Sequence, residues 1–396
     1  MGITKKFLNM FKSGKEGENE EERLRAQKER SDHFLRALTG GDLDTRWNAV
    51  RSVGDLGEAF IEPLIGGLKD DYWIIRRGSA DTLGKIGRPA VDPLIKALDE
   101  PRDDVRQEII HALQLIGEPA VEPLLHATKH TFPLIRRGAV QALGIMGEER
   151  AMGALIECLK DGDAGVRYEC AVAFGRIGDA RAVGPLIGAL NDTREPVRTA
   201  AMATLVSLGE PAIEPLIRAL VDPNEDVCRR SMLALITLGE SAIEPLIGAL
   251  SDTTPGIRRG AVETLGQIGS TRAITPVIAL LDDPERIARI EVVKALAALG
   301  VPAIAPLMQV FRQGDGKTRT AAMEALWMIG QPATTPLIMV LKDDQSDVRK
   351  RAALLLGEIG DQKAADHLTS LLTDENVTVR REAFEALENI KRQNTA

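Results

Sequence analysis

Residues 212–220 read AIEPLIRAL, and residues 242–250 repeat them as AIEPLIGAL. The proline of this segment recurs along the chain with a period of about 30 to 32 residues. It stands at Pro63, Pro93, Pro123, Pro185, Pro215, Pro245, Pro276, Pro306 and Pro336. Self-similarity at a fixed period of this length is typical of repeat proteins, in which each unit packs only on its neighbours.

Each unit is predicted to be a pair of antiparallel helices. In the first segment, Ile213, Leu216 and Leu220 have the spacing of one helical face, and Pro215 lies in the first turn, where no N–H donor is needed. A second apolar helix follows and ends at a glycine, as expected for a C-terminal cap. Aligning these second helices gives twelve units over residues 31–391. The terminal glycines are Gly57, Gly87, Gly117, Gly147, Gly178, Gly209, Gly239, Gly269, Gly300, Gly330 and Gly360.

The repeat resembles the HEAT-like repeat of the phycobilin lyase class. The shared pattern is x-Pro-Leu-Ile-x-Ala-Leu-x-Asp-x5-Arg-x2-Ala-x2-Ala-Leu-Gly-x-Ile-Gly, and it covers about nine tenths of the chain. The resemblance implies an all-α, armadillo-type fold: a right-handed α-solenoid of about twelve two-helix repeats. It does not decide the function, because this family holds scaffolds, lyase subunits, a hydroxylase and DNA-binding enzymes.

Composition narrows the class of protein. The chain has 396 residues and a net charge of −8, and it is 44% hydrophobic but only 3% aromatic, which suits closely packed helices of Leu, Ile, Val and Ala. No apolar run approaches the roughly 18 residues of a membrane span. The first 15 residues lack the apolar core of a signal peptide. Cys158, Cys170 and Cys228 stand singly, without CxxC spacing, so we expect an intracellular, cytoplasmic protein.

The ends of the chain depart from the repeat. Residues 1–30 are predicted to be a basic amphipathic arm followed by a flexible linker, and residues 24–38 to hold the first helix of the first unit. Residues 1–12 combine apolar side chains with lysines, so the arm is expected either to touch an anionic membrane surface weakly or to cap the first repeat. Residues 392–396 are predicted to be a polar tail. The oligomeric state is not predicted.

An arginine stands near the start of nearly every second helix, and an acid precedes it by six residues in most units. In HEAT-like proteins such residues look like an internal ladder that ties the turns of successive repeats by charge-assisted hydrogen bonds. We therefore predict a structural role, with a loss of stability when one partner is removed. The arginines are Arg46, Arg76, Arg106, Arg136, Arg167, Arg198, Arg258, Arg289, Arg319, Arg349 and Arg380. The acids are Asp70, Glu100, Asp161, Asp192, Asp222, Asp252, Asp283, Asp343 and Asp374.

The ladder has two gaps. Cys228 replaces an arginine, and His130 replaces an acid. Either gap could mark a specialised surface, although drift in a tolerant repeat is the simpler interpretation. Because Arg229 and Arg230 follow Cys228, a reactive thiol with a lowered pKa is a further alternative.

Catalytic and metal-binding patterns are scarce. His126 and His130 are four residues apart but are expected to flank a turn, so no metal site is predicted. The chain contains neither GxxxxGK[ST] nor GxSxG, and the recurrent Gly-x-Ile-Gly is a helix stop. We predict no catalysis and no cofactor.

A protein-binding groove is the leading functional prediction, because the second helices of this family typically line the concave face. Apolar residues occupy exposed positions there that are elsewhere polar, and an exposed apolar patch rimmed by charge is typical of a protein-binding surface. The alternative is that neighbouring repeats bury these side chains. The residues at these positions are Tyr168, Val172, Ala203 and Leu233, with Ile236 close by. A second apolar group is Ile290, Trp327 and Met328, and the basic rim is Arg77, Arg137, Arg229 and Arg259.

Two other functions stay open. The first is an accessory subunit of a bilin-lyase-like or other protein-modifying enzyme, in which the groove presents a substrate protein. The second is binding of a nucleic-acid backbone along the basic column. The net charge of −8 and the few aromatic side chains disfavour nucleic acid.

Overall fold

The computed structural model describes residues 20–40, 42–52 and 57–395. These residues form α-helices joined by short 3₁₀ helices and turns, and no β-strand occurs among them. The prediction of an all-α fold is confirmed. None of the helices described is long and apolar enough to cross a membrane.

The described α-helices form twelve consecutive pairs, as predicted, and we call the first helix of each pair the A helix and the second the B helix. The A helices are α2 (Glu20–Gly40), α4 (Ile61–Gly67), α6 (Val91–Ala97), α8 (Glu118–Ala127), α10 (Met152–Cys158), α12 (Val183–Ala189), α14 (Glu210–Arg218), α16 (Glu240–Ala249), α18 (Ile274–Ile278), α20 (Val301–Gln313), α22 (Thr334–Val340) and α24 (Ala365–Ser370). The B helices are α3 (Leu43–Ser52), α5 (Trp73–Ile86), α7 (Asp103–Ile116), α9 (Pro133–Met146), α11 (Ala164–Ile177), α13 (Glu195–Leu208), α15 (Glu225–Leu238), α17 (Pro255–Ile268), α19 (Arg286–Leu299), α21 (Gly316–Ile329), α23 (Ser346–Ile359) and α25 (Val377–Thr395).

Short 3₁₀ helices extend many of the A helices at one end, and α18 and α24 at both ends. Those before an A helix are η1 (Glu58–Phe60), η2 (Arg88–Ala90), η3 (Glu149–Ala151), η4 (Ala180–Ala182), η6 (Thr271–Ala273), η8 (Gln331–Ala333) and η9 (Gln362–Ala364). Those after one are η5 (Ala219–Val221), η7 (Ala279–Asp282) and η10 (Leu371–Thr373).

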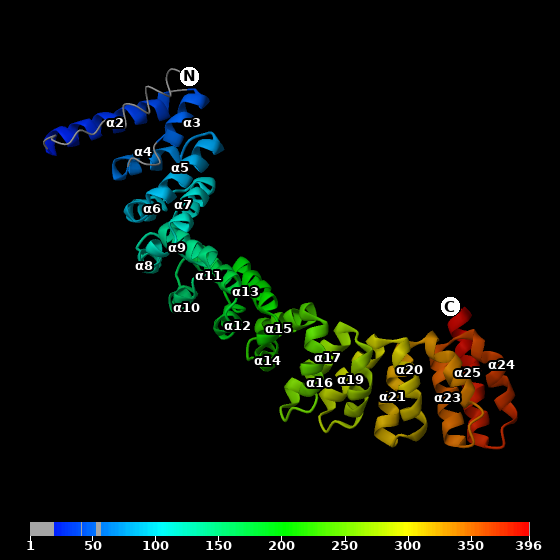
Figure 1. Cartoon of the computed structure of the whole chain (residues 1–396). Coiled ribbons are helices and arrows are strands. Elements are labelled where there is room, and N and C mark those ends of the chain that lie inside the picture. The colour runs from blue at the N-terminus through cyan, green and yellow to red at the C-terminus, as the bar shows by residue number, and fades with distance from the viewer. Residues whose placement is uncertain (1–19, 41, 53–56, 396) are drawn as a thin grey trace. The chain divides into compact units, whose positions relative to one another are not determined.

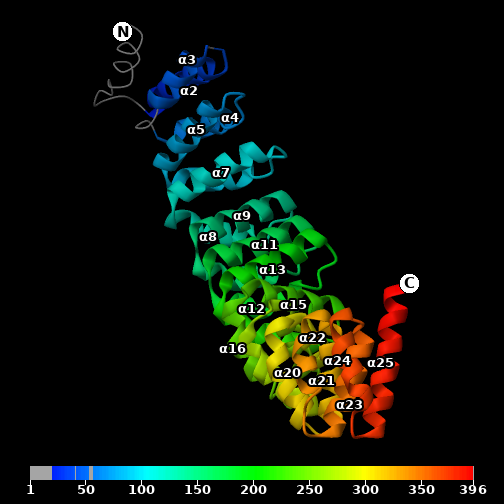
Figure 2. The same cartoon turned by 90° about the vertical axis from the view of Figure 1, so that its right-hand side faces the viewer.

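The chain divides into two compact units, Met1–Leu208 and Gly209–Ala396, which are described separately. Within each unit the helix pairs stack in chain order (Figure 1), and each B helix packs against the next. Figure 2 shows α9, α11 and α13 of the first unit side by side. In the second unit, α23 packs on α25 in the same way. This stacking is that of an α-solenoid, whereas the right-handed superhelix stays a prediction.

A leucine-rich core runs inside each repeat. The residue that follows the repeated proline, for example Leu216 or Leu246, is fully buried, and so is the large apolar residue of the B helix, for example Leu235 or Phe174. The A and B helices of a pair therefore bury their apolar faces against each other, as the periodicity predicts.

Glycines have two separate roles in the B helices. The glycines predicted to end these helices all have positive φ, between 56° and 79°, a region that favours glycine. Inside α23, Gly357 allows a close helix contact, because a Cβ there would lie 2.6 Å from the Cα of Ala386 on α25. This second role was not predicted from the sequence.

The structure differs from the predicted boundaries at both ends. Helix α2 begins at Glu20 rather than at the predicted residue 24, so the first A helix begins inside the predicted arm and linker of residues 1–30. At the other end, α25 continues to Thr395. Gln393 Nε2 donates to the carbonyl oxygen of Glu358 at 3.4 Å, and Asn394 Nδ2 donates to that of Gly360 at 3.3 Å. These amides bond carbonyl groups at the end of α23 that have no helical N–H partner, and so hold the last turns of α25 against the preceding repeat.

Candidate functional site

The ladder arginines bond two repeats at once. Arg167 Nη1 donates to the carbonyl oxygen of Asp161 in its own turn at 2.8 Å. Its Nε and Nη2 donate to the two carboxylate oxygens of Asp192 in the next repeat, at 2.6 and 2.9 Å. Asp192 Oδ1 also accepts the backbone N–H of Arg194 at 2.8 Å, so one carboxylate orders its own turn and holds the preceding repeat. Bidentate arginine–carboxylate pairs are among the strongest side-chain hydrogen bonds.

This complete geometry recurs in both units. The two-bond pairs are Arg136–Asp161, Arg167–Asp192, Arg258–Asp283 and Arg349–Asp374, and Arg46–Asp70 makes one such bond. The Arg349 and Asp374 side chains are only 9% and 7% exposed. Hydrogen bonds from Arg349 hold the pKa of Asp374 below its ordinary value, and Arg258 does the same for Asp283.

Other ladder arginines keep the bond to their own turn but meet a different acid. Arg106 donates to the carbonyl oxygen of Glu100 and pairs with Asp103 at 2.6 Å. Arg76 with Asp104 (3.3 Å) and Arg198 with Glu195 are of the same kind. Arg319 pairs with Asp347 at 3.1 Å but donates to the carbonyl oxygen of Arg312 at 3.5 Å instead of the usual one. Arg289 and Arg380 donate to the carbonyl oxygens of Asp283 and Asp374.

Basic side chains at the ends of A helices pair with some of the predicted acids. These pairs were not predicted from the sequence. Glu100 pairs with Lys69 at 2.7 Å, Asp252 with Arg218 at 2.9 Å, and Asp343 with Arg312 at 2.8 Å. Lys69 and Arg312 therefore compete with the ladder arginines Arg76 and Arg319 for these carboxylates. Arg218 instead takes the place of the arginine that is missing at Cys228. Asp222 accepts the backbone N–H of Asn224 at 2.8 Å, as the other ladder acids do in their turns.

The two ladder gaps each keep part of the usual bonding. His130 Nδ1 accepts the backbone N–H of Phe132 at 3.1 Å, which is the capping bond that a carboxylate makes in other units. Cys228 Sγ donates to the carbonyl oxygen of Asp222 at 3.0 Å, the bond that an arginine makes elsewhere. Burial and the charge of Asp222 raise the pKa of the Cys228 thiol, so the alternative of a lowered thiol pKa is wrong. The residues described contain no cluster of three or more metal-ligating side chains.

We call the exposed side of the B helices the B face. Two arginines of its predicted basic column are neutralised by the next repeat, since Arg77 pairs with Glu108 at 3.2 Å and Arg137 with Glu169 at 3.1 Å. Glu169 is only 5% exposed. These glutamates stand two residues after a ladder arginine and form a second row of pairs that the sequence analysis missed. Of the other column members, Arg229 pairs with Asp226 of its own helix at 2.5 Å, and Arg259 is exposed.

One groove on the B face of the first unit gathers predicted binding residues. Tyr168, which is 37% exposed, and the half-buried Val172 line it from α11. Helix α13 supplies Thr199 and Ala203 to the opposite wall. We call this apolar groove of about 700 Å³ the Tyr168 groove. Leu233 and Ile236 belong to α15 of the second unit, where Leu233 is exposed and Ile236 is partly buried.

A second groove lies on the B face across α21, α23 and α25 and has a volume of about 780 Å³. Trp327 is 52% exposed and lines it, so we call it the Trp327 groove. Its other lining residues, which the sequence analysis did not single out, are Thr320, Met323, Glu324, Arg351, Leu354, Leu355, Glu358, Asn389 and Gln393. The predicted residues Met328 and Ile290 are exposed but do not line this groove.

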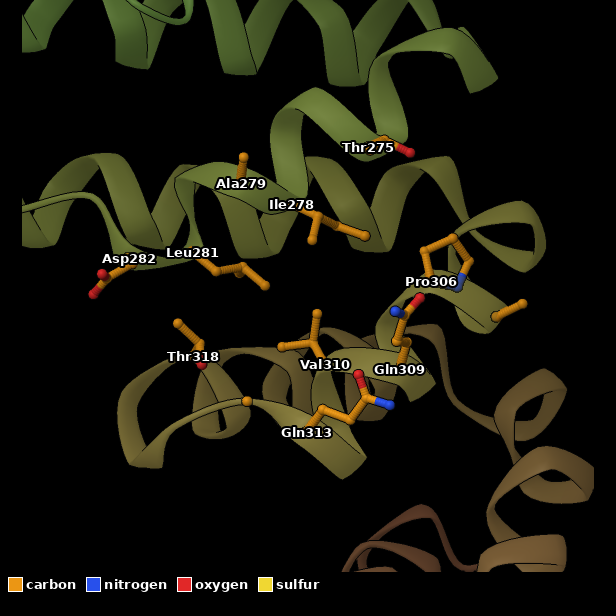
Figure 3. Close-up of a pocket in the computed structure, with 12 residues that line it drawn as sticks. Thr275, Ile278, Ala279, Leu281, Asp282, Pro306, Gln309, Val310, Gln313 and Thr318 are labelled. Carbon is orange, nitrogen blue, oxygen red and sulfur yellow. The ribbon is translucent and has the colours of Figure 1, made fainter.

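A third cavity, of about 700 Å³, was not predicted and lies between A helices of the second unit. Figure 3 shows Ile278 and Leu281 on one side and Val310 on the other, facing the same space. The ladder pair is missing here, because the repeat after Arg289 has Gln313 where most repeats have an acid. The missing acid is the sequence signal that could have pointed to this cavity.

Removing a buried ladder arginine is expected to destabilise the fold. Arg349→Ala leaves the Asp374 carboxylate buried without its bidentate partner and should lower the free energy of unfolding by about 2 to 4 kcal/mol. The matched control is Arg381→Ala, because Arg381 is 68% exposed and makes only a 3.6 Å pair within its own helix. That control should change stability by less than about 0.5 kcal/mol. Urea unfolding followed by circular dichroism measures both, and equal effects would contradict the ladder assignment.

The ladder also predicts a loss of stability in acid. Asp283 and Asp374 have folded pKa values below the ordinary value of 3.8, so their contribution to stability is complete above that value. It is lost as the pH falls through 3.8 toward the folded pKa, because the unfolded chain binds these protons first.

Urea midpoints measured between about pH 5 and about pH 3 should therefore fall steeply for the wild type and less steeply for Asp374→Asn. Parallel curves for the two proteins would show that this carboxylate does not contribute in this way.

Comparison with known proteins assigns the repeat to a family. The chain matches the HEAT repeats family at residues 31–114, 91–170, 152–237, 213–297, 275–354 and 334–396. No curated protein matches it significantly. Nothing in these matches assigns the phycobilin lyase class within the HEAT-like repeats.

Several solved structures are distantly similar to this chain. One is a Kap121p mutant, with 11% identity over 100% of this chain and 54% of that chain and a TM-score of 0.42. Yeast importin-β (Kap95p) has 13% identity over 98% of this chain and 67% of that chain, with a TM-score of 0.35. Importin β in an ammonium sulfate condition has 15% identity over 94% and 63%, with a TM-score of 0.36. Structural similarity at this level does not indicate a function. The repeat matches extend from residue 31 to the last residue, so the chain belongs to the HEAT-repeat family.

Proposed function

We propose that this HEAT-repeat chain is a non-catalytic scaffold that holds a protein or peptide segment on its B face. The observation that carries the proposal is the Tyr168 groove, an open apolar groove of about 700 Å³ between adjacent B helices. Tyr168 is 37% exposed at a position that is charged or polar in most repeats. Open grooves lined by tyrosine or tryptophan are typical sites for the anchoring side chains of a protein partner.

The distribution of charge supports a partner on the B face rather than at the inter-helix turns. At the turns, ladder arginines and acids bond each other and the backbone, as Arg167 and Asp192 do. Such groups would have to give up strong internal bonds to bind a partner. The walls of the Tyr168 groove are Val172, Ala203 and other small or apolar side chains, which gain free energy when a partner covers them.

The alternatives differ in what the groove would hold. An accessory subunit of a bilin-lyase-like or other modifying enzyme would use the same groove to present a substrate protein, so this alternative is a special case of the proposal. Binding of a nucleic-acid backbone is disfavoured, because Arg77 and Arg137 are already paired with glutamates and the net charge is −8.

A cytoplasmic location stays a prediction. Residues 1–19 lie outside the described residues, so the membrane contact of residues 1–12 also stays a prediction.

Photo-crosslinking tests whether a partner binds the B face or the side formed by the A helices. A photoreactive phenylalanine derivative at position 168 on the B face should crosslink a protein partner in native lysate. The matched control is position 339 on the A helix α22, where Met339 is an apolar side chain that is 72% exposed. With the captured partner purified, Tyr168→Ala should weaken its affinity by about tenfold, as expected for loss of a buried aromatic anchor, and Met339→Ala should leave the affinity unchanged.

Crosslinks of equal yield at both positions, or a partner whose affinity does not depend on Tyr168, would contradict the proposal. Circular dichroism of each variant first has to show wild-type helix content, so that a loss of binding is not a loss of fold.

A further inference from the structure

We propose that the Trp327 groove takes a lysine or arginine side chain from the bound partner. This inference rests on the proposed function, since it names the chemistry of one contact on the same B face. Glu324 and Trp327 stand three residues apart on α21 and share a helical face. Glu358 joins them from α23, so two carboxylates and an indole line one groove of about 780 Å³.

Both carboxylates of the groove are available for a cation. Among the described residues, neither Glu324 nor Glu358 forms an ion pair, and both are exposed. Arg351 is the one cation among the lining residues, and its Nε donates to Asp347 at 3.0 Å, outside the groove. The groove therefore offers two unpaired negative charges and no unpaired positive charge.

The shape of the lining suits a long basic side chain. Met323 and the partly buried Leu354 form apolar walls for an aliphatic stem, which lysine and arginine bury while their charged ends stay polar. The half-exposed Trp327 ring offers a face for the cation, and tryptophan is the best aromatic partner for this interaction. The carboxylates of Glu324 and Glu358 would then bond the ammonium or guanidinium group.

The Tyr168 groove lacks the unpaired carboxylates of the Trp327 groove. Its single lining acid, Glu195, already pairs with Arg198 and accepts from Thr199 Oγ1 at 3.2 Å. Tyr168 and Val172 therefore face a groove that favours an apolar side chain, whereas the Trp327 groove combines apolar walls with unpaired carboxylates. Charge complementarity thus assigns a basic residue to the Trp327 groove alone of the two.

Fluorine NMR of the full chain labelled with 5-fluorotryptophan tests this assignment. The chain has three tryptophans, Trp47, Trp73 and Trp327, so each signal can be assigned by a Trp→Phe substitution. Trp73 is the matched control, because it is 66% exposed and lines neither groove. The probes are N-acetylarginine amide and N-acetylcitrulline amide, which have nearly the same shape but differ in charge, and N-acetylleucine amide.

The proposal predicts a saturable shift of the Trp327 signal with N-acetylarginine amide, with half-saturation in roughly the millimolar range. N-acetylcitrulline amide should bind at least about fivefold more weakly. The double variant Glu324→Gln/Glu358→Gln should lose the same factor, and added salt should weaken binding of the cation. The Trp73 signal should respond little to any probe.

Three results would overturn the inference: no saturable shift at Trp327, equal affinity for the arginine and citrulline amides, or preference for the leucine amide. None of these decides the proposed function, which depends on partner crosslinking at position 168 in the other unit. Conversely, failure of crosslinking at position 168 would reject the proposed function without changing the affinity of the Trp327 groove for a cation.

Discussion

Hydrogen bonds from the ladder arginines order the turns of successive repeats, and four of these arginines make two bonds to the aspartate of the next repeat. In Arg167–Asp192 and Arg349–Asp374, the same guanidinium also bonds a carbonyl oxygen of its own turn. Each such residue therefore links the start of its own B helix to the start of the next one. Apolar burial holds a helix pair together, but it is not directional, whereas these bonds require a defined distance between neighbouring turns.

Much of the fold could be predicted from the sequence, because the residues that determine it recur. Leucines at helical spacing, a proline in the first turn and a glycine at the end of each B helix predicted the pairs and their number. The positions of the ladder residues could be predicted as well. Which acid each arginine meets could not be predicted, since Lys69 competes for Glu100 and Arg76 turns to Asp104 instead. Such choices depend on the local reach of side chains from neighbouring repeats.

The candidate sites were harder to predict, because they too depend on side chains from neighbouring repeats. Tyr168 could be singled out because it breaks a polar column, and Trp327 because it forms an apolar group with Ile290 and Met328. Both prove to be partly exposed and to line grooves. The depth of each groove depends on residues of the adjacent repeats, such as Ala203 for Tyr168 and Leu354 for Trp327. The pairing of Arg137 with a buried Glu169 was also missed, because the two positions lie in different columns of different repeats. This pairing removes charge from the B face and leaves its apolar grooves as the more distinctive surface.

Hydrogen exchange of the full chain with and without its captured partner tests most directly the claim that the B face is the binding side. The account predicts slower exchange in the B helices that form the grooves, α11, α13, α21 and α23, with no change in the A helices of the same repeats. Slower exchange confined to A helices, for example α12 and α22, would contradict it.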